Sequence, residues 1–320
     1  MVTYLLRRLL QVPLLLFGIV VFTFILIHVA PGDPIVALAG EYGNAAYYEE
    51  MRAKFGLDRP LPEQLLTYLT NLARGDLGRS YTYGQPVMQV ILDRTATTLL
   101  LVGVAFILST FMGLSLGLLA ARWPRTLLDT AVTILLLIGY ALPVFWLAQM
   151  MIYFLALKGG WFPIQGMTNA RQRYEGWQLW VDVAHHLALP ALALAVQQMA
   201  LIGRLAHSEM LDVLGQPFIV TARGKGLYGR QVFLGHALRN ALLPIVTVIG
   251  GRIGFLIAGA VLTETVFAWP GLGRLLLEAT QARDYPILMG MLLLVSVTVI
   301  IANLITDVVY VWLDPRITFT

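Results

Sequence analysis

The chain has 320 residues, of which 58% are hydrophobic and only 12% are charged, and its mean hydropathy is +0.75. A soluble domain carries about 25% charged residues, so this composition excludes an ordinary soluble globular protein and predicts an integral membrane protein. The absence of cysteine excludes a disulfide framework and a thiolate metal site, and the net charge of +4 comes from basic residues that flank apolar segments, so nucleic-acid binding is not expected.

An apolar segment over residues 9–30 follows Arg7 and Arg8 near the start of the chain. A signal peptide has an apolar stretch of only about 7–15 residues. We therefore expect residues 1–30 to form a cytoplasmic N-terminus and a retained first transmembrane helix. Residues 31–94 are the longest polar stretch and predict an extracytoplasmic segment, which either receives a partner protein or simply covers the helix ends.

Five further apolar segments predict a core of five transmembrane helices within residues 95–320, so that the chain has about six in all. They lie at residues 98–120, 131–157, 187–205, 241–262 and 287–313. Pro143 should kink the second of these segments, as membrane helices tolerate. Pro190 should lie in the first turn of the next segment, where proline costs little.

Basic residues predict the orientation of these helices. In the short segments assigned to the cytoplasm, Lys and Arg outnumber Asp and Glu, whereas the segments assigned to the outside are balanced. The positive-inside rule therefore places both termini in the cytoplasm. Glycines four residues apart suit close packing of membrane helices; the pairs are Gly113 with Gly117 and Gly250 with Gly254.

The segment over residues 206–240 is basic and amphipathic, although it lies between two apolar spans. Its two apolar-faced pieces meet at three closely spaced glycines, Gly224, Gly226 and Gly229. Because glycine permits a tight turn, the pattern predicts two short helices in a hairpin. Such a hairpin either docks another protein on the cytoplasmic side or lies on anionic lipid.

This segment resembles the EAA loop of ABC-importer permeases, and in particular that of the dipeptide/oligopeptide/nickel branch. The runs Thr-Ala-Arg-Gly-Lys-Gly-Leu at 221–227 and His-Ala-Leu-Arg-Asn-Ala-Leu-Leu-Pro at 236–244 carry the resemblance. Further runs similar to that branch lie at 31–34, 56–60, 75–78, 143–146, 264–273, 283–286 and 313–316. They cover nearly the whole chain in the expected order, and they resemble the first-permease (B-type) subunit.

The loop departs from the general pattern at its start, where Glu-Ala-Ala is replaced by Val220, Thr221 and Ala222. A polar contact made by the missing glutamate is therefore not expected here. The resemblance implies an ATPase-coupling site formed by nine residues: Thr221, Ala222, Arg223, Gly224, Lys225, Gly226, Leu227, Arg230 and His236.

The resemblance implies an all-α, type I ABC importer permease fold in the inner membrane of a bacterium. It also implies four kinds of partner around the chain in the lipid bilayer: a homologous second permease, two ABC ATPase subunits and an extracytoplasmic substrate-binding protein. The chain has no P-loop of its own, because the Gly-Lys at 224–225 lacks the required glycine at 219 and hydroxyl residue at 226. ATP and Mg are thus expected on the partners, and this chain should hold no cofactor or metal and act as a non-catalytic transport subunit.

Polar residues within the apolar spans are candidates for the translocation pathway. Arg252 in the fifth span is costly in lipid, so it either faces substrate or pairs with Asp307 in the sixth. Gln197 and Gln198 bind either substrate or a neighbouring helix. Glu264, just past the fifth span, either shapes an outer gate or caps a turn.

Di- or oligopeptides are the expected substrates, and nickel chelates or glutathione are the alternatives. Adjacent His185 and His186 near Asp182 could contact nickel, but neighbours on a helix point about 100° apart and do not form a compact metal site. The sequence agrees less well with two other classes of membrane protein. An ion-coupled carrier usually shows inverted repeats, and a membrane enzyme needs a convergent catalytic set; neither pattern is visible.

Overall fold

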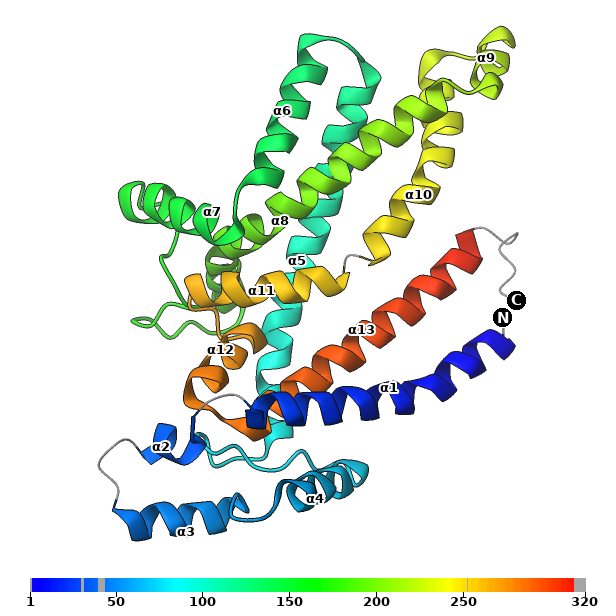
Figure 1. The fold of residues 1–320 in the computed structure, drawn as a ribbon. Coiled ribbons are helices and arrows are strands. Elements are labelled where there is room, and N and C mark those ends of the chain that lie inside the picture. The colour runs from blue at the N-terminus through cyan, green and yellow to red at the C-terminus, as the bar shows by residue number, and fades with distance from the viewer. Residues whose placement is uncertain (1, 30–31, 40–43, 252, 314–320) are drawn as a thin grey trace. The chain divides into compact units, whose positions relative to one another are not determined.

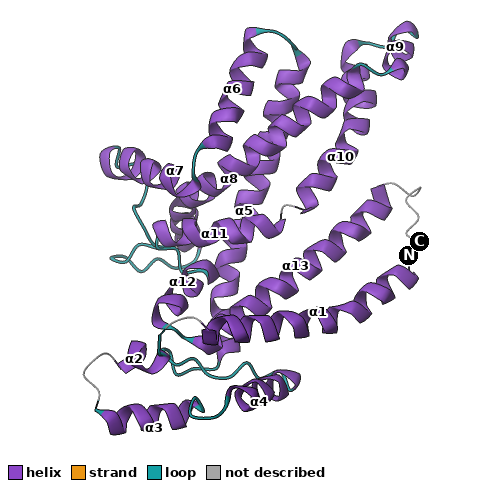
Figure 2. Cartoon of the chain, in the orientation of Figure 1, coloured by secondary structure: helices purple, strands orange, loops and turns teal. Residues whose placement is uncertain are grey.

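The computed structural model describes residues 2–29, 32–39, 44–251 and 253–313 of the chain. The described residues form helices joined by turns and loops, and the one β-contact among them is an isolated bridge between Arg79 and Pro86 (Figure 1, Figure 2). An α-helix satisfies its backbone hydrogen bonds internally, which an apolar segment in lipid requires. The expectation of an all-α membrane protein is confirmed.

The helices divide into two compact units. The first takes in Met1–Thr97 and Pro270–Ile301, and the second Thr98–Trp269 and Ala302–Arg316. The long helices α5 (Val87–Arg122) and α13 (Tyr285–Leu313) pass from one unit to the other.

In the first unit, short helices pack against the end of the long apolar helix α1 (Val2–Val29). The other helices of this unit are α2 (Pro34–Ala39), α3 (Ala45–Phe55), α4 (Leu61–Ala73), α12 (Leu272–Ala282) and the first part of α13. Val20, Phe24 and Ile27 of α1 are buried against α4 and against Met289 of α13. The last third of α1 is thus covered by α4.

Turns in the first unit explain several of the short runs that resemble the peptide-permease branch. Gly56 ends α3 in the left-handed conformation (φ +68°), which glycine adopts at little cost. Asp76 accepts a hydrogen bond from the backbone N–H of Gly78 at 2.8 Å. Asp33 accepts one from the N–H of Ile35, also at 2.8 Å, and pairs with Arg52. These runs shape the backbone of the unit.

The second unit is organised around α8 (Trp177–Leu214), a 38-residue helix that contacts α6 (Leu127–Ala141), α7 (Val144–Met151), α10 (Leu238–Gly251) and α11 (Ile253–Val266). A π-helical segment, η1 (Ile152–Lys158), continues α7. The short α9 (Pro217–Gly224) and the π-helical η2 (Gln231–Ala237) connect α8 to α10.

Helix α5 approaches α8 closely at the two glycines singled out in the sequence. A Cβ added at Gly117 would lie 2.3 Å from the carbonyl oxygen of Gly203, and one added at Gly113 would lie 2.8 Å from that of Met199. No side chain fits at either distance. The prediction of close helix packing at Gly113 and Gly117 is therefore confirmed.

Within the described residues, four helices are long and apolar enough to cross a membrane, or five if a bent pair counts as one span. The bent pair is α6 with α7–η1, which meet at 103° around Pro143. A kink was expected there, but the bend is much larger. Proline removes a backbone hydrogen bond and restricts the residue before it, which lets the chain change direction.

Two other helix boundaries differ from the sequence-based expectation. Helix α8 begins ten residues before 187, so Pro190 lies inside the helix and not in its first turn. The predicted fifth span, 241–262, corresponds to α10 and α11, which begin earlier, at Leu238, and end later, at Val266. Hydropathy locates apolar chain, but it does not show how far a helix extends beyond the apolar segment.

Candidate functional site

Residues 215–237 form a hairpin of two short helices, here called the α9–η2 hairpin. Helix α8 ends at Leu214 with Gly215 as its C-cap, and Pro217 lies in the first turn of α9, where its missing N–H costs nothing. The turn comes at Gly226, whose φ is +81° and whose N–H donates to the carbonyl of Arg223 at 2.9 Å. The side-chain oxygen of Gln231 then accepts from the N–H of Tyr228 at 3.1 Å as η2 begins. The expected tight turn at Gly226 is present.

The inner face of the hairpin belongs to one apolar cluster. It buries Ile219 and Ala222 of α9 and Val232, Phe233 and Ala237 of η2. The same cluster contains residues of three long helices: Ala121 of α5, Met210 of α8 and Ala241 of α10. Each fully buried aliphatic or aromatic side chain contributes about 1.5–3 kcal/mol, so the hairpin is held firmly to the ends of these helices.

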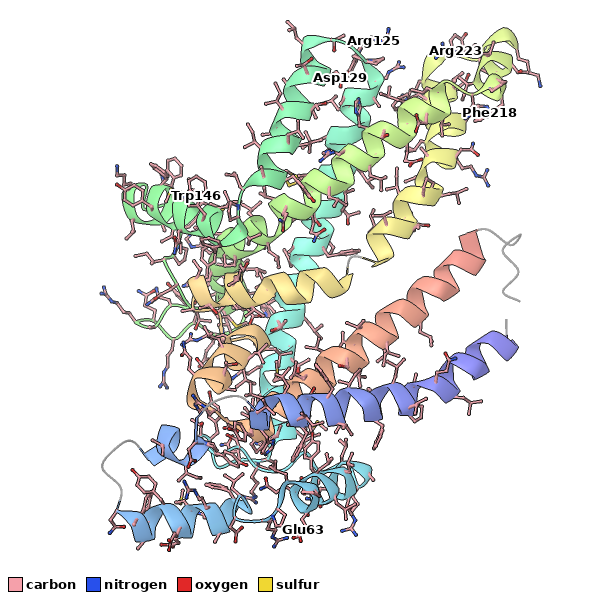
Figure 3. The ribbon with its side chains drawn as sticks, viewed as in Figure 1. Glu63, Arg125, Asp129, Trp146, Phe218 and Arg223 are labelled. Carbon is pink, nitrogen blue, oxygen red and sulfur yellow. The ribbon has the colours of Figure 1, made fainter. Side chains whose placement is uncertain are left out.

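The outer face combines exposed apolar and basic side chains. Val220 and Tyr228 are 69% and 78% exposed, and Arg223, Lys225 and Arg230 are exposed as well. Figure 3 shows Phe218 and Arg223 projecting from α9 at the far end of α8. An exposed apolar patch with basic residues beside it is typical of a protein–protein interface.

A cleft of about 370 Å³ lies between the hairpin and the end of α5. Arg122 and Arg223 line it, together with apolar residues of α8 and η2. The guanidinium of Arg122 lies over the Phe233 ring at 5.3 Å, a cation–π contact that ties α5 to the hairpin. Two arginines in an apolar cleft can accept an acidic side chain of a partner.

The same end of α8 is also tied to the α5–α6 turn. His207 Nε2 lies 3.0 Å from an Asp129 carboxylate oxygen, and the other oxygen accepts from the backbone N–H of Arg125 at 2.8 Å (Figure 3). The turn and the hairpin thus end in one packed region of the second unit.

The predicted coupling residues fall into two groups in the structure. Ala222 is buried in the hairpin core and Leu227 is half-buried, so both pack internally. The other seven are exposed, namely Thr221, Arg223, Gly224, Lys225, Gly226, Arg230 and His236. Sequence reasoning did not select Val220, Tyr228 or Arg122. The sequence did contain a signal for Val220 and Tyr228, because both are large side chains at positions that lie off the apolar face formed by the buried residues.

The predicted pathway residues do not form one cluster among the described residues. Gln198 of α8 is buried and Gln197 half-buried, and within the described residues the side-chain oxygen of Gln198 has no hydrogen-bond partner. Glu264 lies within α11 and not beyond it; it is fully buried and accepts from the Thr98 hydroxyl at 2.6 Å. Arg252 and the side chain of Asp307 lie outside the described residues.

His185 and His186 lie in the first half of α8 and are directed to different partners. His185 Nε2 is 2.8 Å from the carbonyl of Trp161, and His186 Nδ1 is 2.9 Å from that of Asp182. Their ring centroids are 6.4 Å apart. In the part of the chain that the structure describes, no three His, Asp or Glu side chains gather as metal ligands.

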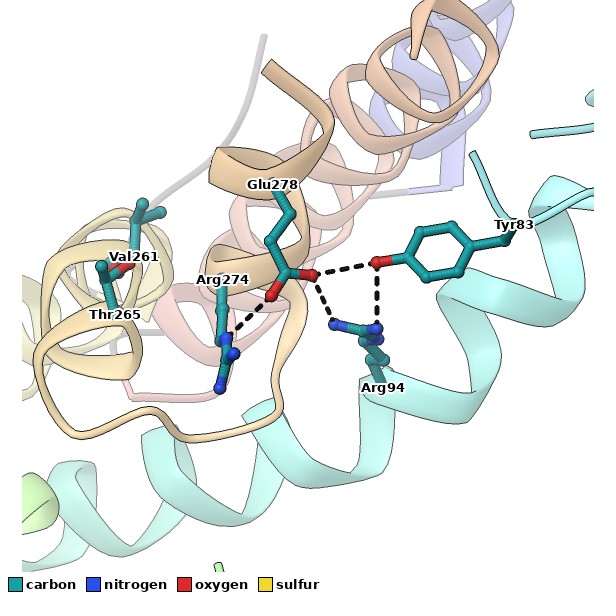
Figure 4. Close-up of polar contacts among 6 residues, drawn as sticks. All are labelled: Tyr83, Arg94, Val261, Thr265, Arg274 and Glu278. Carbon is teal, nitrogen blue, oxygen red and sulfur yellow. Dashed lines mark hydrogen bonds and ion pairs between the residues drawn. The ribbon is translucent and has the colours of Figure 1, made fainter. Parts of the chain in front are cut away.

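A polar network in the first unit links α12 to the start of α5 (Figure 4). One Glu278 carboxylate oxygen accepts from the Tyr83 hydroxyl at 2.9 Å and from Arg94 at 3.2 Å, while the other accepts from Arg274 at 2.8 Å. Burial alone would raise the pKa of Glu278, but the hydrogen bonds from Tyr83 and Arg274 and the nearby charges hold it below its ordinary value.

A second carboxylate, Asp284, secures the start of α13. It is fully buried and accepts from the Ser80 hydroxyl at 2.5 Å and from the backbone N–H of Thr82 at 3.0 Å. It also lies 3.4 Å from the N–H of Ile287 in the first turn of α13. Because a buried carboxylate needs several donors, Asp284 stabilises the position of the loop before α5 against the start of α13.

Comparisons with known proteins agree with this arrangement. The family model described as "Binding-protein-dependent transport system inner membrane component" matches residues 113–319, and its N-terminal counterpart matches residues 1–102. The dipeptide transport system permease protein DppB of Escherichia coli K12 is 39% identical over 335 residues, covering 99% of both chains. The oligopeptide permease AppB of Bacillus subtilis is 39% identical over 321 residues, covering 100% of both.

Solved structures support the fold alone. A chain of the inward-facing MetNI methionine ABC transporter has a TM-score of 0.57 at 19% identity, covering 71% of this chain and 97% of that one. A chain of an amino acid ABC transporter crystallised with histidines has a TM-score of 0.51 at 12% identity. The chain has the fold of the type I ABC importer permeases. The chain belongs to the binding-protein-dependent transport system inner membrane components.

Proposed function

We propose that this permease subunit forms half of the translocation pathway of an importer for di- or oligopeptides, driven by ATPases that dock on the α9–η2 hairpin. The relatives named for dipeptides and oligopeptides, similar over nearly the whole chain, support the substrate class. The observation that carries the docking role is the hairpin itself, with exposed Val220, Tyr228 and basic residues over a core shared with α5, α8 and α10.

ATP hydrolysis belongs to separate subunits in this proposal. The only Gly-Lys pair, at 224–225, lies in the hairpin turn and lacks the P-loop spacing. The hairpin therefore transmits force and does not bind nucleotide. The complex contains two such ATPases, a homologous second permease and a substrate-binding protein on the outside. Both termini of this chain are cytoplasmic, and residues 31–94 lie on the side of the binding protein.

The transmission is mechanical. Closure of the ATPase pair on ATP moves the hairpin, and because the hairpin shares one buried cluster with three long helices, these move with it. Packed elements switch between discrete arrangements more readily than they deform. Movement of α5, α8 and α10 re-orients the pathway, and Gln197, Gln198 and Glu264 on α8 and α11, with Arg252 and Asp307, are the residues proposed to line or shape it.

The hairpin turn gives the sharpest test. A valine at residue 226 would have to adopt φ near +81°, which is a strained conformation for a β-branched residue. We expect Gly226→Val to leave the two permeases and two ATPases assembled but to reduce peptide uptake into proteoliposomes by at least about tenfold. Gly235→Ala, at a glycine of η2 that has open space around it and is not among the predicted coupling residues, is the matched control and should stay within about twofold.

The substrate class is tested in the same proteoliposomes. ATP hydrolysis by the complex is measured with its binding protein loaded with a dipeptide panel, with a nickel chelate or with glutathione. Stimulation by dipeptides is the expected result. Stimulation by nickel chelate or glutathione alone would replace the peptide assignment, and wild-type uptake by Gly226→Val would remove the coupling role of the turn.

A further inference from the structure

A cavity of about 350 Å³ lies in the first unit and is not used by the proposed coupling mechanism. It is an open cavity lined by the last turns of α1, the end of α3, the α3–α4 turn, α4, the loop before α5 and the start of α13. A volume near the lower end of the range for small-molecule sites can hold a headgroup-sized ligand.

One wall of this cavity is a continuous chain of five rings. The centroid distances are 4.0 Å from Phe24 to His28, 5.3 Å from His28 to Tyr285, 6.4 Å from Tyr285 to Tyr81 and 4.4 Å from Tyr81 to Phe55. Aromatic rings at the end of a membrane helix mark the level of the lipid headgroups. Helix α1 spans Leu10–Val29 as an apolar segment, so His28 lies at its last turn.

Two buried polar atoms at the cavity have no hydrogen-bond partner within the described residues: the Tyr68 hydroxyl and Nε2 of His28. Buried polar groups are nearly always paired, so both atoms indicate a missing ligand or water. Their requirements differ. His28 Nδ1 lies 2.8 Å from the carbonyl of Phe24 and must donate to it, which leaves Nε2 of the neutral ring as an acceptor. Tyr68 has a hydroxyl to donate.

The charged residues that line the cavity are basic. They are Lys54 and Arg59, and among the described lining residues none is acidic. Gln64 of α4 also lines the cavity, but its amide already donates to the carbonyl of Arg59 at 2.8 Å. The two cations therefore face a site that favours an anion.

We infer that this cavity binds the headgroup of an anionic phospholipid, with the phosphate received by Lys54, Arg59 and the Tyr68 hydroxyl and a headgroup hydroxyl donated to His28 Nε2. The ligand needs both an anionic acceptor and a neutral donor, and phosphatidylglycerol carries both. An ammonium headgroup would supply a donor but would be repelled by the two cations. The acyl chains would run outside the cavity along α1, whose Phe22, Ile25 and Leu26 are exposed.

The test uses the purified full-length permease complex, delipidated and then exposed to phosphatidylglycerol, phosphatidylcholine or phosphatidylmethanol, with retained lipid counted by native mass spectrometry. Phosphatidylmethanol keeps the phosphate charge but lacks the hydroxyl. Expected retention is highest for phosphatidylglycerol and lowest for phosphatidylcholine. Transport is not the readout, so the result is independent of the proposed substrate and coupling role.

Three variants locate the binding. The double change Lys54→Ala with Arg59→Ala should lower phosphatidylglycerol affinity by at least about tenfold, and Tyr68→Phe, which removes only one oxygen, by about fivefold. Arg74→Ala, an exposed arginine at the end of α4 outside the cavity, should change it by less than twofold. Thermal unfolding in detergent checks that each variant is folded, and Tyr68→Phe serves if the double variant is not.

Several outcomes would overturn the assignment. Equal retention of phosphatidylcholine would show that charge does not select the ligand, and equal retention of phosphatidylmethanol would remove the role of His28. Glycerol phosphate that binds as tightly as the lipid would make a soluble phosphate the ligand. Loss of binding in Arg74→Ala to the same degree as in the double variant would place the lipid elsewhere.

Discussion

At the scale of single residues, carboxylates in this chain fasten helices and turns. Glu278 accepts from Tyr83 and Arg94 in two other parts of the first unit and from Arg274 in its own helix. Asp284 holds the start of α13 through donors at Ser80 and Thr82, and Glu264 in the second unit accepts from the Thr98 hydroxyl of α5. Apart from the Arg274–Glu278 pair, these contacts join residues that are far apart in sequence, so the sequence could not assign them.

The Glu278 network predicts a pH-dependent contribution to stability. Its pKa in the folded protein lies below the ordinary value of 4.5, so the carboxylate stabilises the fold above that value and the contribution is lost as pH falls through the folded-state pKa. We expect Glu278→Gln to unfold at a lower temperature than wild type at pH 7. The loss in free energy of unfolding should be roughly 1 kcal/mol or less, because the group is partly exposed.

The difference between Glu278→Gln and wild type should shrink as the pH falls below 4.5. Thermal unfolding of the detergent-solubilised protein, followed from about pH 3.5 to about pH 7, measures this difference. Glu50→Gln is the matched control, because Glu50 is exposed on α3. A gap that stays constant with pH would show that the change acts through packing and not through charge.

At the scale of elements, the glycines of α5 set the distance to α8. A side chain at residue 117 would meet the backbone of Gly203 and the Cβ of Ala206, neither of which can turn aside. Forcing extra volume into a packed contact costs about 1–3 kcal/mol. Gly117→Val should therefore lower the unfolding temperature of the complex in detergent. Gly103→Val, at a glycine of the same helix with open space around it, should leave that temperature within about 1 °C.

How well the sequence predicted these elements depended on what each one faces. Apolar composition located the apolar helices α1, α5 and α8, and the glycine-rich turn at Gly226 located the hairpin, because both are local properties. Pro143 indicated a kink but not its size, because a proline permits a change of direction without fixing the 103° angle. The extension of α8 back to Trp177 was missed because it is polar and leaves no hydropathy signal.

The hairpin was predicted in shape but only partly in detail. The repeated apolar residues indicated an inner face, and Val232 and Phe233 do lie in the core. The resemblance to the EAA loop predicted coupling residues around the turn, and one of these, Ala222, is buried in the hairpin core. Arg122 could not have been found from the loop, since it reaches Phe233 from the end of α5.

At the scale of the whole molecule, the outer face of the hairpin should hold the ATPases in place. Val220 is exposed and apolar where the general loop carries glutamate, so its contact is expected to be apolar. Val220→Asp should reduce co-purification of the ATPase subunits by about tenfold, because a desolvated unpaired carboxylate opposes docking. Leu127→Asp, at a 90% exposed leucine in the first turn of α6, is the control and should leave co-purification unchanged.

Wild-type recovery of ATPase with Val220→Asp would mean that Val220 is not part of the docking surface. The basic residues Arg223, Lys225 and Arg230 would then be the next to test, since charge complementarity governs the rate of encounter more than its strength.

The length of α8 has a geometric consequence. A helix of 38 residues is about 57 Å long at 1.5 Å per residue, nearly twice the thickness of about 30 Å of a hydrocarbon core. It is therefore a rigid arm longer than the hydrocarbon core is thick, and the hairpin follows its last turn. A tilt of about 10° about its first turn displaces the last turn by about 10 Å. A small tilt of α8 among its neighbouring helices thus corresponds to a large displacement of the hairpin, where the ATPase subunits are proposed to bind.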